Sequence, residues 1–119
     1  MKKTVVLGAS PNPSRYSNIA TNRLKRYGHE TVPVGIRKGE ICGLDIQLGQ
    51  PEIEGVDTIT LYMNPTRQQP HYDYIFSLQP KRIIFNPGTE NPKLIELAQA
   101  KGIETTIACT LVMLSVGSY

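Results

Sequence analysis

The chain has 119 residues, of which 39% are hydrophobic and 19% charged, with a formal net charge of +3 at pH 7. That length suffices for one domain with a buried core, but not for a binding domain joined to a catalytic one. No apolar run approaches the roughly 20 residues that span a bilayer, and the apolar segment after Lys2 and Lys3 is too short for a signal peptide. We therefore expect a cytoplasmic protein with no membrane partner, and the weak, scattered positive charge does not indicate a nucleic-acid partner.

Short segments rich in β-branched residues recur along the chain and predict five strands. These are Lys3–Leu7, Glu30–Val34, Thr58–Tyr62, Arg82–Phe85 and Glu104–Ala108. The long glycine-rich stretch between the second and third strands has only a weak strand-like piece at Glu40–Cys42, and we expect an irregular connection there.

Amphipathic segments between the strands predict three helices. Ser17 or Asn18 can cap the first helix, which ends at Gly28. The second runs from Pro70 to about Leu78, and the third begins at the cap pair Asn91-Pro92 and ends at Gly102. We expect no further packed helix in the segment that starts at Cys109.

This alternation predicts an α/β fold over residues 1–119. We expect a single-domain, Rossmann-like, doubly wound parallel sheet of about five strands, with helices on both faces and strand order 3-2-1-4-5. In such a sheet every connection that leaves the carboxyl end of a strand emerges at one edge, where ligands bind. The five connections concerned are residues 9–17, 35–38, 63–67, 86–89 and 109–110, and together they contain four arginines and lysines but no carboxylate.

The first of these connections has the features of a phosphate-binding turn. Gly8 permits the tight turn, Ser10 offers a hydroxyl, and Arg15 can donate two hydrogen bonds to a phosphate. The start of the following helix, near Ser17, would add free backbone N–H groups. Only one glycine of the dinucleotide pattern G-x-G-x-x-G is present, so an ordinary turn with a surface arginine is the alternative.

The second connection distinguishes between nucleotides. An NAD-binding domain usually has an acidic residue at the end of its second strand, whereas this chain has Arg37 and Lys38 there. Basic residues suit a phosphorylated ribose, either the 2′-phosphate of NADP or the 3′-phosphate of coenzyme A (CoA). Solvated surface side chains are the alternative for at least one of the two.

With these connections placed, the sequence resembles the small CoA-binding domain family. The segment "VVLGASPNPSRYSNIATNRLKRYGHETVPV" is similar to that family's G-(A/S)-S-x-x-P-x-R-x-S loop and the helix and strand after it. "EICG", "FNPGTENPKLIELAQAKGIET" and "ACTLVML" resemble later family segments. The same Rossmann-type fold forms the N-terminal domain of the succinyl-CoA synthetase α subunit.

The resemblance implies a set of CoA contacts. Gly8, Ser10 and Arg15 would lie along the pyrophosphate, with Ser17 at the helix start. Val34 would border the adenine, and Arg37 or Lys38 would meet the 3′-phosphate. Asn64, Pro65 and Arg67 would line the far side of the crevice. Two positions depart from the family pattern: Gly35-Ile36 replaces Asn-Pro, and Asn86 replaces a glutamine.

No catalytic constellation can be assembled from the sequence. His29 and His71 are the only histidines, and no Ser/His/Asp set, carboxylate pair or metal-ligand cluster is evident. Cys109 is expected to behave as a small hydrophobic residue, the alternative being a mixed disulfide with CoA.

We therefore predict a non-catalytic module that binds CoA or an acyl-CoA. The alternatives are an NADP-binding subunit of an oxidoreductase that a partner completes, and a scaffold or interaction protein without a ligand. The apolar segment "LVMLSV" leaves open a homo-oligomer or a partner enzyme subunit.

Overall fold

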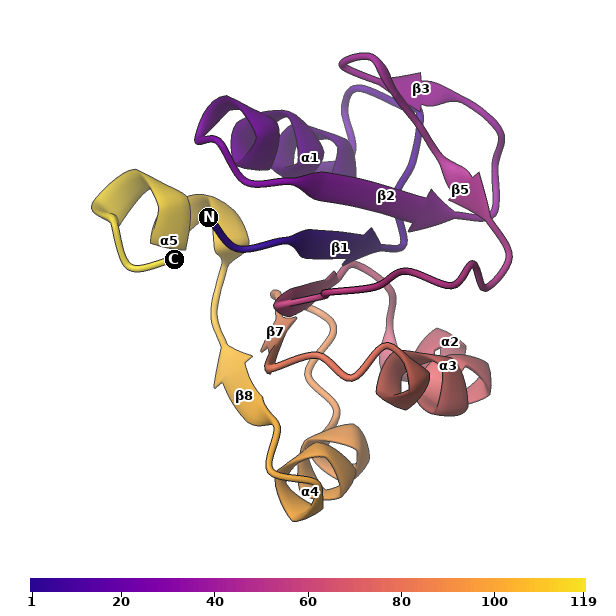
Figure 1. Ribbon diagram of the computed structural model, residues 1–119, viewed down its shortest axis with the longest axis vertical. Coiled ribbons are helices and arrows are strands. Elements are labelled where there is room, and N and C mark those ends of the chain that lie inside the picture. Colours follow the sequence, from indigo (N-terminus) through magenta and orange to yellow (C-terminus); the bar gives the residue numbers. More distant parts are fainter.

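The computed structural model describes residues 1–119, which form a six-stranded parallel sheet with helices on both faces (Figure 1). The predicted α/β class is therefore confirmed. The strands of this sheet are β1 (Thr4–Leu7), β2 (Thr31–Gly35), β5 (Gln47–Leu48), β6 (Thr58–Leu61), β7 (Arg82–Phe85) and β8 (Glu104–Ile107). A separate antiparallel hairpin consists of β3 (Glu40–Ile41) and β4 (Leu44–Asp45). The helices are α1 (Tyr16–Arg26), α2 (Pro65–Gln68), the 3₁₀ turn η1 (Gln69–His71), α3 (Tyr72–Ser77), α4 (Pro92–Ala100) and α5 (Thr110–Val116).

The strand order is β5-β2-β1-β6-β7-β8, so the predicted order 3-2-1-4-5 is wrong. The strand at Thr58–Leu61 pairs with β1 and β7 in the middle of the sheet and does not lie outside β2. The place beside β2 belongs to β5, a strand of two residues within the segment expected to be irregular. Two residues are too few for an alternating pattern, and this is why the sequence did not reveal β5.

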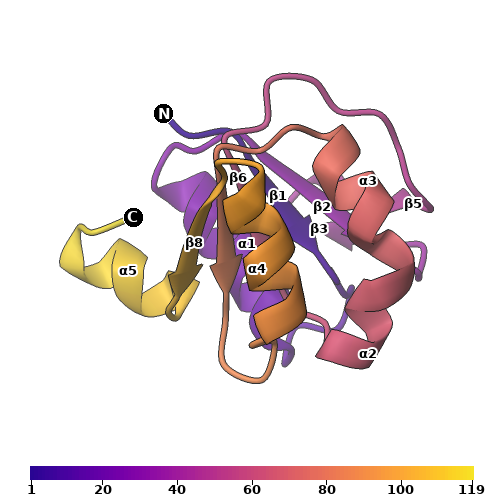
Figure 2. The same cartoon turned by 90° about the horizontal axis from the view of Figure 1, so that it is seen from below.

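Alternate residues of the buried strands face two apolar layers. Val5 and Leu7 of β1 pack with Ile75 of α3 and Leu94 of α4. Val6, between them, packs on the other face in a cluster that includes residues of α1, the β3–β4 hairpin and α5, and its buried members are Val6, Ala9, Leu24, Ile41, Ile46 and Leu114. Figures 1 and 2 show α1 and α4 on opposite sides of the sheet. The strands are buried on both faces because helices cover each one.

The structure corrects two expectations about the first two helices. The cap of α1 is Arg15, not Ser17 or Asn18. Asn18 lies one turn inside, where its side-chain N–H donates to the carbonyl of Ser10 at 2.9 Å and so ties the helix to the preceding loop. The expected single helix from Pro70 is instead the series α2, η1 and α3, which begins at Pro65 because the Asn64 side chain accepts from the N–H of Arg67.

The start of α4 matches the prediction. The side chain of Asn91 accepts from the N–H of Leu94, Pro92 is the first helical residue, and Gly102 follows the end.

The expectation of no packed helix after Cys109 is wrong. Met113 and Leu114 of α5 are buried on the α1 face of the sheet. The N–H of Thr110 donates to the Asn86 side chain at 2.8 Å, and the Thr110 hydroxyl lies 2.8 Å from that of Thr60. A helix of 7 residues is too short to show a clear periodic pattern of apolar residues in the sequence. The position of α5 on the sheet depends on these tertiary contacts.

Candidate functional site: a basic cleft at the carboxyl edge of the sheet

A cleft of about 820 Å³ opens at the carboxyl edge of the sheet. The ends of β1, β2 and β6 form its floor through Leu7, Val34 and Tyr62. Its walls come from the β1–α1 loop, the residues after β2 and β5, the α2–η1 segment and the β7–α4 loop. This is the switch point of the sheet, where the chain runs from β1 to β2 on one side while β6 lies on the other (Figure 1).

The structure brings together most of the residues that the sequence predicted for the site. Those that line the cleft are Gly8, Ser10, Arg15, Ser17, Val34, Arg37, Asn64 and Arg67. Lys38 and Pro65 do not line it. The chain bends at Ile36 and Arg37 and then packs Gly39 against Pro11, which leaves Lys38 exposed outside the cleft. Pro65 is the first residue of α2, where a missing N–H costs nothing.

Hydrogen bonds among its own residues order the β1–α1 loop. The Asn12 side chain accepts from both the N–H and the hydroxyl of Ser14, at 3.0 and 2.8 Å. The hydroxyl of Ser10 accepts from the N–H of Asn12 at 3.1 Å. No side chain caps α1, so the first N–H groups of that helix are free at the cleft, where Tyr16 and Ser17 are lining residues. Free N–H groups at the start of an 11-residue helix favour an anion.

Two glycines hold this loop close to the neighbouring strands. Gly8 has φ +100°, and a Cβ there would lie 2.9 Å from the backbone of Tyr62. At Gly35 a Cβ would lie 2.3 Å from the carbonyl oxygen of Ala9. The carbonyl of Val34 accepts from the N–H groups of both Gly8 and Ala9, at 2.9 Å each. Gly35 is thus the residue that this close approach requires.

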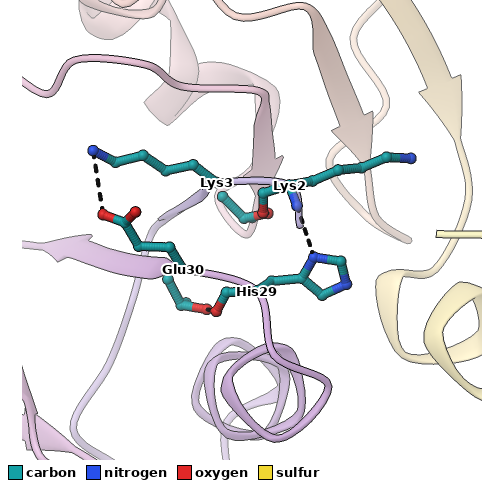
Figure 3. Close-up of polar contacts among 6 residues, drawn as sticks. Lys2, Lys3, His29 and Glu30 are labelled. Atoms are coloured by element: carbon teal, nitrogen blue, oxygen red, sulfur yellow. Dashed lines mark hydrogen bonds and ion pairs between the residues drawn. The ribbon is translucent and has the colours of Figure 1, made fainter.

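The charge of the residues that line the cleft favours anions. Its charged lining side chains are Arg15, Arg37 and Arg67, which come from three different connections, and no carboxylate lines it. The one ion pair of the structure joins Lys3 and Glu30 at the opposite edge of the sheet, 3.3 Å apart (Figure 3). The three arginines are therefore without a protein counter-ion and are free to bind phosphates.

Several lining residues were not among the predicted contacts. Tyr62, Met63, Gln50, His71, Gly88 and Thr89 all line the cleft. Burial raises the pKa of the Tyr62 phenol well above its usual range, so this hydroxyl stays protonated at neutral pH. Gln50 follows β5, which the sequence did not reveal. The sequence predicts that the connections after β6 and β7 emerge at this edge, and the position of Met63 and Thr89 in these connections is enough to indicate them as lining residues.

Asn86 and Cys109, which follow strands at this edge, do not line the cleft. Asn86 is buried, donates to Thr60 and to the carbonyl of Leu61, and accepts from Thr110. Cys109 precedes α5 as its cap residue and is not among the cleft-lining residues, so it stays a prediction that this thiol behaves as a small hydrophobic side chain.

None of the helices has the length and apolar character that crossing a bilayer requires. A comparison with curated proteins gave no match.

Solved structures share the whole fold. A crystal structure of a protein described as uncharacterized is 57% identical, with a TM-score of 0.98, and the match covers 100% of this chain and 98% of that one. A hypothetical protein from Pyrococcus horikoshii OT3 is 22% identical with a TM-score of 0.84, over 97% of this chain and 82% of that one. A conserved hypothetical protein from Pyrococcus furiosus is 27% identical with a TM-score of 0.77, over 89% and 92%.

The family comparison is more specific. Residues 2–115 match the family described as CoA binding domain, which covers every strand of the sheet and every connection that forms the cleft. The Rossmann-like sheet, the cleft at its switch point and this match agree, and the chain belongs to the CoA binding domain family.

Proposed function

We propose that this protein binds CoA or an acyl-CoA in the basic cleft and does not itself catalyse a reaction. The observation that supports this most directly is the charge of the cleft. Three arginines from three connections meet there without a carboxylate, beside a helix start that no side chain caps. CoA carries a pyrophosphate and a 3′-phosphate, so its nucleotide half is the kind of polyanion that such a cleft attracts.

The proposed pose assigns one phosphate group to each end of the cleft floor. The pyrophosphate lies at the N-terminus of α1, where Ser10, Arg15 and the first N–H groups of the helix can donate to it. Arg37, after β2, binds the 3′-phosphate, and the adenosine lies near Val34. Arg67 lies on the opposite wall, with Asn64, and faces the rest of the ligand across the cleft.

The titratable groups of the cleft support a binding role rather than a catalytic one. Arginine does not give up its proton in proteins, and the phenol of Tyr62 has a raised pKa. Tyr16 and His71 are the other titratable groups among the lining residues, and the side-chain partner of His71 is the Gln50 amide, not a nucleophile or a carboxylate. General acid–base catalysis usually needs a base near a group that it activates.

A ligand series tests the proposal. Isothermal titration calorimetry with CoA, dephospho-CoA, NADP and NAD should show the tightest binding for CoA. In a thermal melt, CoA at about 100 times its Kd should stabilise the fold by roughly 2.7 kcal/mol. The Arg37→Gln variant should lose about tenfold in affinity for CoA and little for dephospho-CoA, because it removes one charge-assisted hydrogen bond to the 3′-phosphate.

Arg26→Gln is the matched control, because Arg26 is exposed in the last turn of α1 and does not line the cleft. It should bind CoA like the unmodified protein. Tighter binding of NADP than of CoA would favour the oxidoreductase-subunit alternative, and no binding of any of the four nucleotides would contradict the proposed function. An equal loss of CoA and dephospho-CoA affinity in Arg37→Gln would remove the 3′-phosphate assignment alone.

A further inference from the structure

The α2–η1 segment and the β7–α4 loop form the far wall of the cleft. Helix α1 packs on the Val6 face of β1, whereas α3 packs on the face of Leu7, so the two flank the central strands from opposite sides (Figure 1). Arg67 is the only arginine or lysine among the lining residues of the far wall. The other lining residues of this wall are Met63, Asn64, Pro70, His71 and residues 87–89.

Buried hydrogen bonds hold this wall together. The side chain of Gln68, which is fully buried, donates from Nε2 to the carbonyls of Met63 and Thr89, at 2.8 Å each. Its Oε1 accepts from the Asn91 side chain at 2.9 Å. Gln68 therefore joins the start of α2 to the β7–α4 loop. Arg67, the residue before it, extends from backbone that these bonds keep in place.

The guanidinium of Arg67 forms no ion pair within the protein. Its side chain is exposed, and the one ion pair of the structure joins two other residues. Glu90 is the carboxylate of the β7–α4 loop, but it accepts from the N–H of Gly88 at 2.7 Å and does not line the cleft. Arg67 can therefore donate two parallel hydrogen bonds to an anionic group of a ligand.

The phosphates of CoA are already matched in the proposed pose. Arg15 and the start of α1 bind the pyrophosphate, and Arg37 binds the 3′-phosphate. The remainder of CoA, from the pyrophosphate to the thiol, carries no charge. The cleft volume of about 820 Å³ is in the upper part of the range of about 300–1,000 Å³ typical of ligand sites, which leaves room beyond the nucleotide half. An uncharged ligand that covers Arg67 leaves its charge unpaired, which is unfavourable, whereas a carboxylate on the acyl group would pair with it.

We propose that Arg67 binds a carboxylate at the end of the acyl group, and that the preferred ligands of the cleft are CoA thioesters of dicarboxylic acids. The inference rests on the proposed function. Arg67 is then a specificity-determining residue, because it distinguishes a thioester with a free carboxylate from a neutral thioester of equal length.

Pairs of thioesters with equal chain length test the inference. The pairs are malonyl-CoA with propionyl-CoA, and glutaryl-CoA with pentanoyl-CoA. In titration calorimetry at about pH 7, the unmodified protein should bind the carboxylated member of at least one pair about tenfold more tightly, because a charge-assisted pair is gained. In Arg67→Gln this ratio should fall to about one, while CoA itself should bind within about threefold of the unmodified protein. Arg67→Lys keeps the charge but not the planar fork and should retain part of the ratio.

Arg15→Gln is the matched control, since it removes another exposed arginine that lines the cleft. It should weaken the binding of both members of a pair by the same factor and keep their ratio. Equal affinities within both pairs for the unmodified protein would overturn the inference while leaving CoA binding intact. An unchanged ratio in Arg67→Gln would also overturn it, and a uniform loss of affinity there would assign Arg67 to a phosphate. Failure of CoA and all four thioesters to bind would instead contradict the proposed function.

Discussion

At Gly35 the backbone leaves no room for a side chain. Because a Cβ would lie 2.3 Å from the carbonyl oxygen of Ala9, Gly35→Ala must push the β1–α1 loop away from β2. We expect a loss of about 2–4 kcal/mol in the free energy of unfolding, measured by urea titration. Gly117→Ala is the comparison: φ there is +76° with no atom near the Cβ, so only the backbone penalty of about 1 kcal/mol applies. Equal losses in the two variants would show that the loop yields easily.

The pKa of His29 is lowered, first by burial and then by the nearby N-terminal ammonium and Lys2. The unfolded chain therefore binds this proton more readily than the folded one. The neutral His29 side chain therefore contributes to the free energy of unfolding. This contribution is fully present at pH values above 6.5, the ordinary pKa of histidine, and is lost as the pH falls below that value. Urea titrations at about pH 7.5 and about pH 5.5 should show a smaller fall in unfolding free energy for His29→Gln than for the unmodified protein. Parallel falls would mean that other groups cause the acid sensitivity.

Helix α5 shows how a short element depends on the rest of the fold. Leu114 is only 4% exposed and packs on the α1 face, whereas Val112 on the same helix is 56% exposed. Leu114→Ala should cost about 2–4 kcal/mol in unfolding free energy because it leaves a cavity. Val112→Ala should change it by no more than about 0.5 kcal/mol. A small loss at Leu114, measured by urea titration, would show that α5 is only loosely docked.

The segment between β2 and β6 is the second element that gains its structure from its surroundings. Ile41 and Ile46 are buried in the layer beneath α1, and the Lys25 ammonium donates to the carbonyl of Cys42 at 2.6 Å. The same segment supplies β5 and Gln50 to the edge of the cleft. The site therefore depends on a segment whose strands are each only two residues long.

At the scale of the whole molecule, the positive and negative charges are unevenly distributed. The net charge is only +3, yet the arginines of the cleft have no carboxylate beside them. Raising the ionic strength from about 50 mM to about 500 mM should weaken CoA binding on the order of tenfold, because salt screens these contacts. Titration calorimetry at several salt concentrations measures this, and Arg67→Gln should reduce the slope. Salt-independent binding would indicate that apolar contacts dominate.

The oligomeric state also belongs to this scale. Met113 and Leu114 of the apolar C-terminal segment are buried within the chain, while Val112 and Val116 stay exposed. Pairing through this segment remains a prediction that sedimentation velocity can test.

The sequence alone was sufficient for the α/β class, for the approximate limits of the five longer strands and for the edge of the sheet where the cleft opens. These features follow from local patterns: β-branched runs, Asn91-Pro92 at a helix start, and polar residues after each strand. Tertiary structure alone decided the place of β6 beside β1, the packing of α5, and the exclusion of Lys38 and Pro65 from the cleft. Strand order, short helices and side-chain direction depend on contacts between distant segments, such as Asn86 with Thr110, and no local pattern encodes these.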